Sequence, residues 1–374
     1  MSIYLDCNAS TPLEPSVAEV MKRYLESEFG NPGSRTHEYG SAAKVGVERA
    51  RSQVASVVNA DKSDVIFTSG ATEANNLALL GLKQYLLEEG KSVITSQIEH
   101  KSVLEPLAYL ESVGVKVAYL EPNEDGVVDP RVLSGCLSDS VGLVSLMHVN
   151  NETGAIQLID KYADLLEGLD VFFHVDAAQG YGKEIGALQH KRIDMISCSA
   201  HKVYGPKGVG ALISRQRRYK RAPLKAITFG GGQERGLRPG TLPTHQIAGF
   251  GVAAELALKN ADSRRLKCAK IKDAALSAFD KLKPIYLGSE NAISSTLNVS
   301  FPGINSEAAI VALKGLVAIS NGSACTSSSY AHSHVLQSMR VDGSVIEGAL
   351  RFSWCHMTED VDWGAITSVL RGLS

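Results

Sequence analysis

The segment Ile193-Asp194-Met195-Ile196-Ser197-Cys198-Ser199-Ala200-His201-Lys202 decides the fold class. It begins as a short apolar run, typical of a strand buried on both faces, and ends in small and polar residues. Open α/β sheets bind ligands at the carboxyl ends of their strands, so Lys202 stands where a ligand site is expected. Lys202 is a candidate Schiff-base lysine, although a lysine after a strand is more often a solvated surface residue.

Other short apolar runs share this form and alternate with helical patterns through short connections. They lie at residues 64–68, 92–95, 141–146 and 171–175. Continuous apolar runs of this length suit strands that are covered on both sides. The pattern predicts an α/β fold with a mostly parallel sheet flanked by helices.

The pattern changes near residues 248–272, where a long helical stretch runs into a charged segment. We interpret it as a connecting helix that leads into a smaller α+β domain. In that domain, residues 296–301 alternate like a half-exposed strand, and helices are expected to start near Ser306 and Glu359. The predicted division is a large domain over 13–255 and a small domain over 1–12 and 256–374.

Composition and charge exclude several classes of protein. The chain has 374 residues, 44% of them hydrophobic, and a formal net charge of -2, so no direct nucleic acid contact is expected. It has no signal-peptide pattern and no apolar run long enough to span a bilayer, which predicts a cytoplasmic protein without a membrane partner. The six cysteines show neither C-x-x-C pairing nor zinc-ligand spacing, so no disulfide scaffold and no metal site are predicted.

A carboxylate and a glycine turn follow two of the expected strands. The run at 171–175 ends in Asp176, and a carboxylate there could keep a pyridine nitrogen protonated, so that a pyridoxal ring accepts electrons; the alternative is a helix-capping aspartate. Residues 65–76 read as strand, glycine turn and helix. The free amides at that helix start, with the Thr72 hydroxyl, can bind a phosphate, although such junctions occur in most α/β proteins.

Three more residues are candidates for chemistry. His100 could lie over a flat ring or be a hydrogen-bonded core or rim residue. Cys325 lies among small polar residues, which predicts a mobile, exposed loop and a reactive thiol; the alternative is an incidental surface cysteine. Arg351, in an apolar strand-like run, could hold an α-carboxylate through two parallel hydrogen bonds or could face water from an edge strand.

Taken together, these segments resemble the NifS/IscS-type cysteine desulfurases of the fold-type I, class V aminotransferase superfamily. The resemblance covers nearly the whole chain, with the motifs in the same order. They lie at 67–73 (FTSGATE), 99–101 (EHK), 148–154 (HVNNETG), 174–176 (HVD), 199–202 (SAHK), 230–236 (GGGQERG) and 322–327 (GSACTS).

The resemblance implies a pyridoxal 5'-phosphate enzyme with the fold-type I architecture. Lys202 would hold the cofactor as a Schiff base, Asp176 would contact the pyridine nitrogen and His100 would stack on the ring. Gln179 and Asn151 would lie beside the ring, with Asn151 also near the substrate.

The resemblance also implies which residues bind the cofactor phosphate and how many subunits form the active unit. The phosphate would be held by Ala71, Thr72, Ser199 and His201. Thr241 would reach the phosphate of the neighbouring subunit, which implies a homodimer.

The implied activity is that of a cysteine desulfurase, which converts L-cysteine to L-alanine. Arg351 would hold the substrate carboxylate, Lys202 would move the Cα proton, and Cys325 would take the sulfur as a persulfide. A sulfur-acceptor protein would then receive it, in iron-sulfur cluster assembly, tRNA thiolation or DNA phosphorothioation. The alternatives are a selenocysteine lyase or aminotransferase of the same superfamily, and an inactive platform that recruits partner proteins.

Some residues depart from the family pattern. Cys7 replaces a common tyrosine or asparagine, Asn321 and Pro239 replace common serines, and Cys355-His356 replaces a glycine-arginine pair. The chain ends at Ser374 without the longer tail of housekeeping members, which favours a different acceptor, such as one in a DndA-like role in DNA phosphorothioation.

Overall fold

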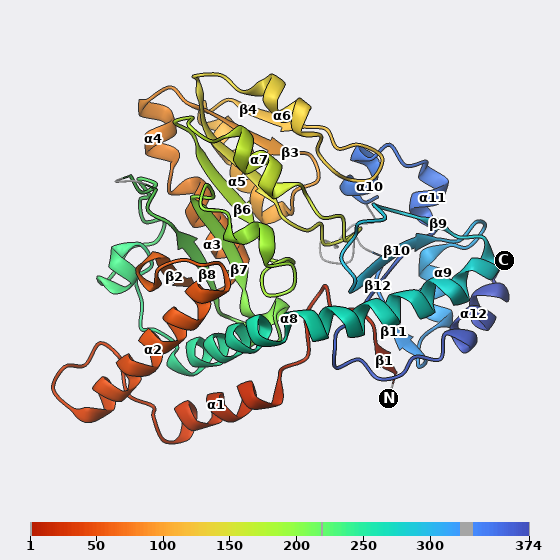
Figure 1. The fold of residues 1–374 in the computed structure, drawn as a ribbon, viewed down its shortest axis with the longest axis horizontal. Coiled ribbons are helices and arrows are strands. Elements are labelled where there is room, and N and C mark those ends of the chain that lie inside the picture. Colours follow the sequence, from red (N-terminus) through yellow and green to blue (C-terminus); the bar gives the residue numbers. More distant parts are fainter. Residues whose placement is uncertain (1, 218–219, 322–331, 374) are drawn as a thin grey trace.

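The computed structural model describes residues 2–217, 220–321 and 332–373. A seven-stranded sheet forms its centre (Figure 1). The strand order is β2 (Val65–Thr68), β8 (Gly210–Ser214), β7 (Met195–Ser199), β6 (Phe172–Asp176), β5 (Val141–Met147), β3 (Ser92–Ser96) and β4 (Val117–Leu120).

This sheet is mostly parallel, as predicted. The pairs from β7 through β6, β5 and β3 to β4 are parallel, and β8 is antiparallel to both of its neighbours. The strands β2, β3, β5, β6 and β7 therefore all end at one edge of the sheet, which is the edge where ligands bind in such folds.

Successive residues of the central strands pack on opposite faces of the sheet. Phe173 and Val175 of β6 join one apolar core, whereas Phe172 joins the other. The first core is covered by α2 (Glu38–Val57), α6 (Pro130–Cys136), α7 (Ile159–Leu165) and the first part of α8 (Thr244–Phe279). The core on the opposite face of the same sheet is covered by α3 (Ala71–Leu80), α4 (Lys83–Glu88) and α5 (Lys101–Ser112).

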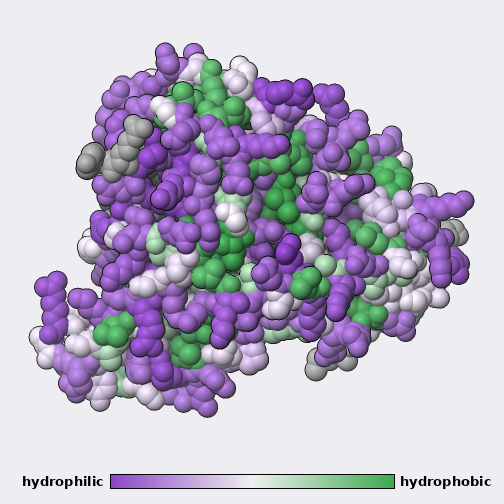
Figure 2. Space-filling model, viewed as in Figure 1, coloured by the Kyte–Doolittle hydropathy of each residue, from purple (hydrophilic) through white to green (hydrophobic). Residues whose placement is uncertain are grey.

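Burial on both faces explains why the strands are continuous apolar runs. The outer surface is different: Figure 2 shows mostly hydrophilic side chains on the face in view, with hydrophobic residues in separate patches. The remaining helix of this part is α1 (Pro15–Glu26), which packs against α8. Short 3-10 turns lie at Lys62–Asp64, Gly186–Gln189, Ala200–Lys202, Gln233–Gly236 and Asp280–Leu282.

A second core lies at the other end of α8. It contains strands of a three-stranded antiparallel sheet in the order β12 (Ala349–Ser353), β10 (Thr296–Ser300) and β9 (Ile285–Tyr286). The helices α9 (Ser306–Ala312) and α12 (Trp363–Arg371) cover it, and the short pair β1 (Ile3–Tyr4) and β11 (Val317–Ala318) lies beside it. Two short helices, α10 (His334–Ser338) and α11 (Gly343–Glu347), pack on a separate small cluster.

The helix α8 joins the two cores, as the sequence predicted for residues 248–272. It runs without a break from Thr244 to Phe279, and Figure 1 shows it along the lower side of both sheets. Its first part packs in the core of the large sheet, whereas Cys268, Ala275 and Phe279 pack in the second core. The predicted domain boundary at 255 falls inside this helix, and the division into two domains stays a prediction.

Two local predictions in the second core were wrong. Every residue of β10 is buried, because β10 lies between β12 and β9 and is not a half-exposed strand. The last helix begins at Trp363 and not near Glu359, because the Asp362 side chain accepts a hydrogen bond from the amide of Ala365 (2.9 Å) and caps the helix there.

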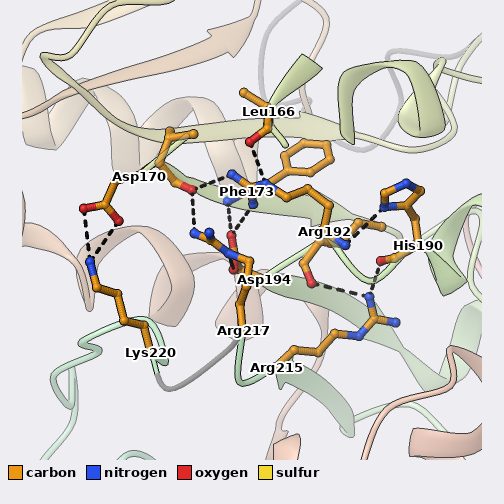
Figure 3. Close-up of polar contacts among 11 residues, drawn as sticks. Leu166, Asp170, Phe173, His190, Arg192, Asp194, Arg215, Arg217 and Lys220 are labelled. Atoms are coloured by element: carbon orange, nitrogen blue, oxygen red, sulfur yellow. Dashed lines mark hydrogen bonds and ion pairs between the residues drawn. The ribbon is translucent and has the colours of Figure 1, made fainter. Parts of the chain in front are cut away.

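Figure 3 shows a network of buried charge at the opposite edge of the large sheet, where β6 and β7 begin. One Asp194 oxygen accepts hydrogen bonds from the guanidinium of Arg192 and the amide of Phe173, both at 2.8 Å. The other oxygen accepts from Arg217 at 2.8 Å. The carboxylate therefore ties the starts of two strands together.

Candidate active site

A cavity of about 400 Å³ opens at the edge of the sheet where the parallel strands end. Its walls come from strand ends, helix starts, the N-terminal segment and β12. Among the lining residues are Asn8, Ala9, Ala71, Thr72, His100, Asn151, Asp176, Gln179, Ser199, His201, Lys202, Lys207 and Arg351. Ten of the twelve site residues predicted from the sequence are in this set.

Lys202 follows β7 in a short 3-10 turn, which brings its side chain into the cavity. Its amine donates hydrogen bonds to the backbone carbonyls of Asn8 and Ala9, the latter at 3.0 Å. Lys202 is therefore an inward amine, and the alternative of a solvated surface lysine was wrong.

Asp176 is the last residue of β6 and is 5% exposed. One carboxylate oxygen accepts a hydrogen bond from the amide of Ala178 (2.9 Å), and the other accepts from the side chain of Asn75 on α3 (2.7 Å). Asn75 also donates to Ser102 at 2.8 Å. These contacts fix the carboxylate at the floor of the cavity.

His100 is the N-cap residue of α5, and its Nδ1 accepts a hydrogen bond from the amide of Ser102 (3.1 Å). Burial is the main cause that lowers the pKa of the His100 imidazole, and the positive charge of Lys202 lowers it further. A neutral ring held in this way can stack on a planar ligand in the cavity.

The start of α3 supplies unpaired amides to the same cavity. Gly70 is its N-cap residue and has no side chain to cap the helix. Gly210 lets β8 approach this turn closely, because a Cβ there would lie 2.7 Å from the Cα of Gly70. Ala71 and Thr72 therefore begin a ten-residue helix at a wall of the cavity, and a phosphate can bind there.

Ser199 and His201 flank this helix start. Burial lowers the pKa of His201 to about 4, and the positive charges of Lys202 and Lys207 act in the same direction. The imidazole is therefore neutral near pH 7, and it offers a hydrogen bond without a formal charge.

Arg351 enters the cavity from β12 and is 1% exposed, so the alternative of an edge-strand arginine that faces water was wrong. Its guanidinium donates to the carbonyl of Asn151 (3.0 Å) and to the carboxylate of Asp6 (2.7 Å). The Nε atom is buried and has no hydrogen-bond partner among the residues that the structure describes. An unpaired buried donor is costly, so this group is suited to a carboxylate ligand.

Gln179 lies beside Asp176, after the end of β6. Its amide nitrogen donates to the carbonyl of Asn8 (2.9 Å), and its Oε1 is buried without a partner in the described part of the chain. An open acceptor at this place can take a hydrogen bond from a ligand in the cavity.

Two predicted site residues are not in the cavity. Thr241 lies in a separate surface hollow formed by Glu73 and the loop from Thr228 to Thr241. Cys325 lies outside the residues that the structure describes. No metal-ligand cluster of three or more His, Cys, Asp or Glu side chains occurs within residues 2–217, 220–321 and 332–373.

Sequence reasoning missed four residues that orient the predicted ones. Asn75 and Ser102 hold Asp176 and His100, whereas Asn8 and Asp6 contact Lys202 and Arg351. A signal existed only for Asn75, which lies at helical spacing from Ala71, Ala78 and Leu79 and is the one polar residue among the buried residues of α3. The other three contacts join segments that are distant in sequence or lie in a turn.

The donor set fits pyridoxal phosphate. The helix start offers free amides for an anionic phosphate, and Asp176 offers a negative charge. Gln179 and Arg351 hold buried polar atoms that have no partner within residues 2–217, 220–321 and 332–373. An amine, a carboxylate and an imidazole also face one cavity, as a planar cofactor with a cationic ring nitrogen requires.

In the part of the chain that the structure describes, no helix is long and apolar enough to cross a membrane.

Comparisons with known proteins agree with this chemistry. The chain matches the aminotransferase class-V family over residues 3–362. It is 44% identical over 372 residues to the cysteine desulfurase IscS of Pseudomonas entomophila (strain L48), which covers 98% of this chain and 91% of that protein.

Two solved structures are also similar. DndA from Streptomyces lividans is 43% identical with a TM-score of 0.83, covering 93% of this chain and 98% of that one. SspA in complex with cysteine is 35% identical with a TM-score of 0.84, covering 96% of this chain and 100% of that one. Members of this enzyme group depend on pyridoxal phosphate. The chain therefore belongs to the cysteine desulfurases of the class-V aminotransferase family.

Proposed function

We propose that this chain converts L-cysteine to L-alanine in the described cavity and passes the sulfur to an acceptor protein through Cys325. The observation that carries the proposal is the convergence of Lys202, Asp176 and Arg351 on one cavity. An amine, a ring partner and a carboxylate-binding group are the three functions that the reaction needs from the protein.

Pyridoxal phosphate, when bound, supplies an electron-withdrawing ring that weakens bonds at the substrate's Cα and Cβ. Asp176 would keep the ring nitrogen protonated, because Asn75 and Ala178 hold its carboxylate in place. Ala71, Thr72, Ser199 and His201 would hold the phosphate, and Lys202 would carry the cofactor. His100 would lie against the ring, with Gln179 and Asn151 at its side.

Arg351 would bind the carboxylate of free cysteine. Its guanidinium is nearly fully buried, and Asp6 and Asn151 fix its orientation. A buried arginine with a free Nε–H binds a carboxylate strongly because both groups are shielded from water. This contact would place the Cα–H of the substrate near Lys202.

Lys202 would then accept the Cα proton and deliver a proton to the product. Its amine already lies against the carbonyls of Asn8 and Ala9, which can hold it in a second position when it leaves the cofactor. The Cys325 thiolate would bond to the substrate sulfur, and alanine and an enzyme persulfide would result. The assignment of Cys325 rests on the sequence.

We further propose that the active unit is a homodimer. The loop from Thr228 to Thr241 forms a hollow separate from the cavity, and Phe229 in this loop is 91% exposed. Burial of such a large exposed aromatic side chain against a second subunit would be favourable. Thr241 would then bind the phosphate in the partner subunit.

The test is to incubate the purified protein with pyridoxal phosphate and cysteine and to quantify alanine and protein-bound persulfide. We expect equal amounts of both in the first turnover, with the added sulfur mapped to Cys325. The variant Cys136→Ser, at an exposed cysteine, is the matched control and should behave like the wild type.

Two results would contradict the proposal. A Cys325→Ala variant that passes sulfur to an acceptor at the normal rate would remove the role of Cys325. A protein that releases selenium from selenocysteine but makes no alanine from cysteine would be a selenocysteine lyase.

A further inference from the structure

Two buried cysteines that the proposed reaction does not use lie beside the active site. Cys7 and Cys355 are each 1% exposed and pack together with Tyr204.

The backbone around the pair is fixed by hydrogen bonds. Asp6 and Ser353 form a parallel bridge, and the amide of Cys7 donates to the carbonyl of Ser353 (3.1 Å). The amide of Ser353 donates in turn to the carbonyl of Leu5 (2.8 Å). Cys7 therefore begins a turn directly after this bridge, and Cys355 lies two residues beyond Ser353, so the hydrogen-bonded backbone places the two cysteines close together.

The surroundings of the pair make one of the two thiols acidic. The side chains of Cys7 and Cys355 pack together, and the hydroxyl of Thr358 lies 3.8 Å from the Cys355 sulfur. The hydrogen bond from Cys7 is the main cause that lowers the pKa of Cys355 to about 6, and the charge of Lys183 lowers it further. The same hydrogen bond raises the pKa of Cys7. Because the Thr358 hydroxyl also donates to the Cys355 sulfur, we assign Cys355 as the nucleophile of the pair.

We propose that Cys7 and Cys355 are a redox modification site, at which a small peroxide converts the two thiols into one disulfide. The Cys355 thiolate attacks a peroxide oxygen, the O–O bond breaks, and the released hydroxide takes up the proton that Cys355 had lost, which gives a sulfenic acid and one water. The Cys7 sulfur then attacks the sulfenic sulfur and forms the S–S bond, while the S–O bond breaks and the leaving hydroxide takes the Cys7 proton as a second water. In total, two thiols lose two protons and two electrons, and one hydrogen peroxide takes them up and becomes two waters.

The disulfide would also act on the cavity, and this consequence rests on the proposed function. Cys7 lies between Asp6, which holds Arg351, and Asn8, whose carbonyl accepts hydrogen bonds from Lys202 and Gln179. A new bond at Cys7 therefore shifts two residues that contact the site. We expect a higher KM for cysteine in the oxidised enzyme and full recovery after reduction.

The test is peptide mapping by mass spectrometry of the folded protein after treatment with hydrogen peroxide. We expect one linked peptide pair, Cys7 with Cys355, that disappears after dithiothreitol. With a sulfenic acid probe, the variant Cys7→Ser should be labelled at Cys355, whereas Cys355→Ser should leave Cys7 unlabelled. The variants Cys136→Ser and Cys268→Ala are matched controls, because Cys136 is exposed and Cys268 is a third buried thiol near the pair; both should retain the link.

Peptide mapping needs no catalytic activity, so the proposed modification site can be tested independently of the proposed desulfurase activity. Reduced Cys7 and Cys355 beside oxidised Cys136, or a link from Cys355 to Cys268, would overturn the modification site. A linked pair in a protein that makes no alanine from cysteine even when reduced would leave the site intact and contradict the function.

Discussion

Two clusters of buried charge lie at opposite edges of the large sheet, and they differ in how completely their polar atoms are paired. Around Asp194, the side chains of Arg192, Arg215 and Arg217 bind the carboxylate or backbone carbonyls, and the described chain leaves none of their buried atoms without a partner (Figure 3). In the cavity, Arg351 and Gln179 keep buried polar atoms that form no hydrogen bond with any residue the structure describes.

This difference separates a structural site from a binding site. A paired network stabilises the fold and has no capacity left for a ligand. A buried polar atom without a hydrogen-bond partner costs free energy, and a ligand that supplies the missing partner removes that cost.

The largest effect is expected at Lys202. The variant Lys202→Ala should lose desulfuration by about a thousandfold or more, because it removes both the cofactor anchor and the proton carrier. Steady-state assays of alanine formation measure the loss, and Lys259→Ala, on the exposed side of α8, is the matched control. A Lys202→Ala enzyme with a tenth of normal activity would place the catalytic amine elsewhere.

The opposite edge should respond in stability. The variant Asp194→Ala leaves the fully buried Arg192 without its carboxylate, which should lower the free energy of unfolding by about 3 to 5 kcal/mol. Urea denaturation measures it. The exposed pair of Asp170 and Lys220 gives the control, since Asp170→Ala should change stability within error. If folded Asp194→Ala protein loses turnover per bound cofactor, the two edges are not separate in role.

Asp176 should show the reverse behaviour. In the variant Asp176→Asn, the side-chain oxygen can still accept a hydrogen bond from the amide of Ala178, so the fold should remain intact. It has no charge to stabilise a protonated ring nitrogen, so kcat should fall by about a hundredfold or more. Parallel denaturation and activity curves measure both, and a large loss of stability with normal kcat would contradict the assignment.

The smallest effect concerns pH. Burial raises the pKa of Glu99 to about 8, so the folded protein keeps a proton on Glu99 that the unfolded chain releases above about pH 4.5. Stability from this group is present at low pH and is lost as pH rises from about 4.5 through 8, by at most about 1.4 kcal/mol per pH unit. The variant Glu99→Gln should flatten that decrease in urea titrations at pH 6, 7 and 8. An unchanged slope would mean that Glu99 is ionised in the folded protein.

Much of the fold could be predicted because its strands are short apolar runs buried on both faces. The runs that end at Asp176 and near Lys202 predicted two central strands of the sheet and the edge at which ligands bind. Burial of β10 could not be predicted, because its polar residues Asn298 and Ser300 suggested an exposed face until β9 and β12 covered it. The orienting contacts of Asp6 and Asn8 join residues about 345 and 194 positions apart, which no local pattern encodes.

The central claim is that the cavity binds pyridoxal phosphate covalently through Lys202. The most direct measurement is to add pyridoxal phosphate to the purified protein, reduce it with borohydride and map the modified peptide by mass spectrometry. We expect one stoichiometric modification on Lys202 and none on Lys207, which lines the same cavity. Modification of Lys207 or of surface lysines, with Lys202 unmodified, would contradict it.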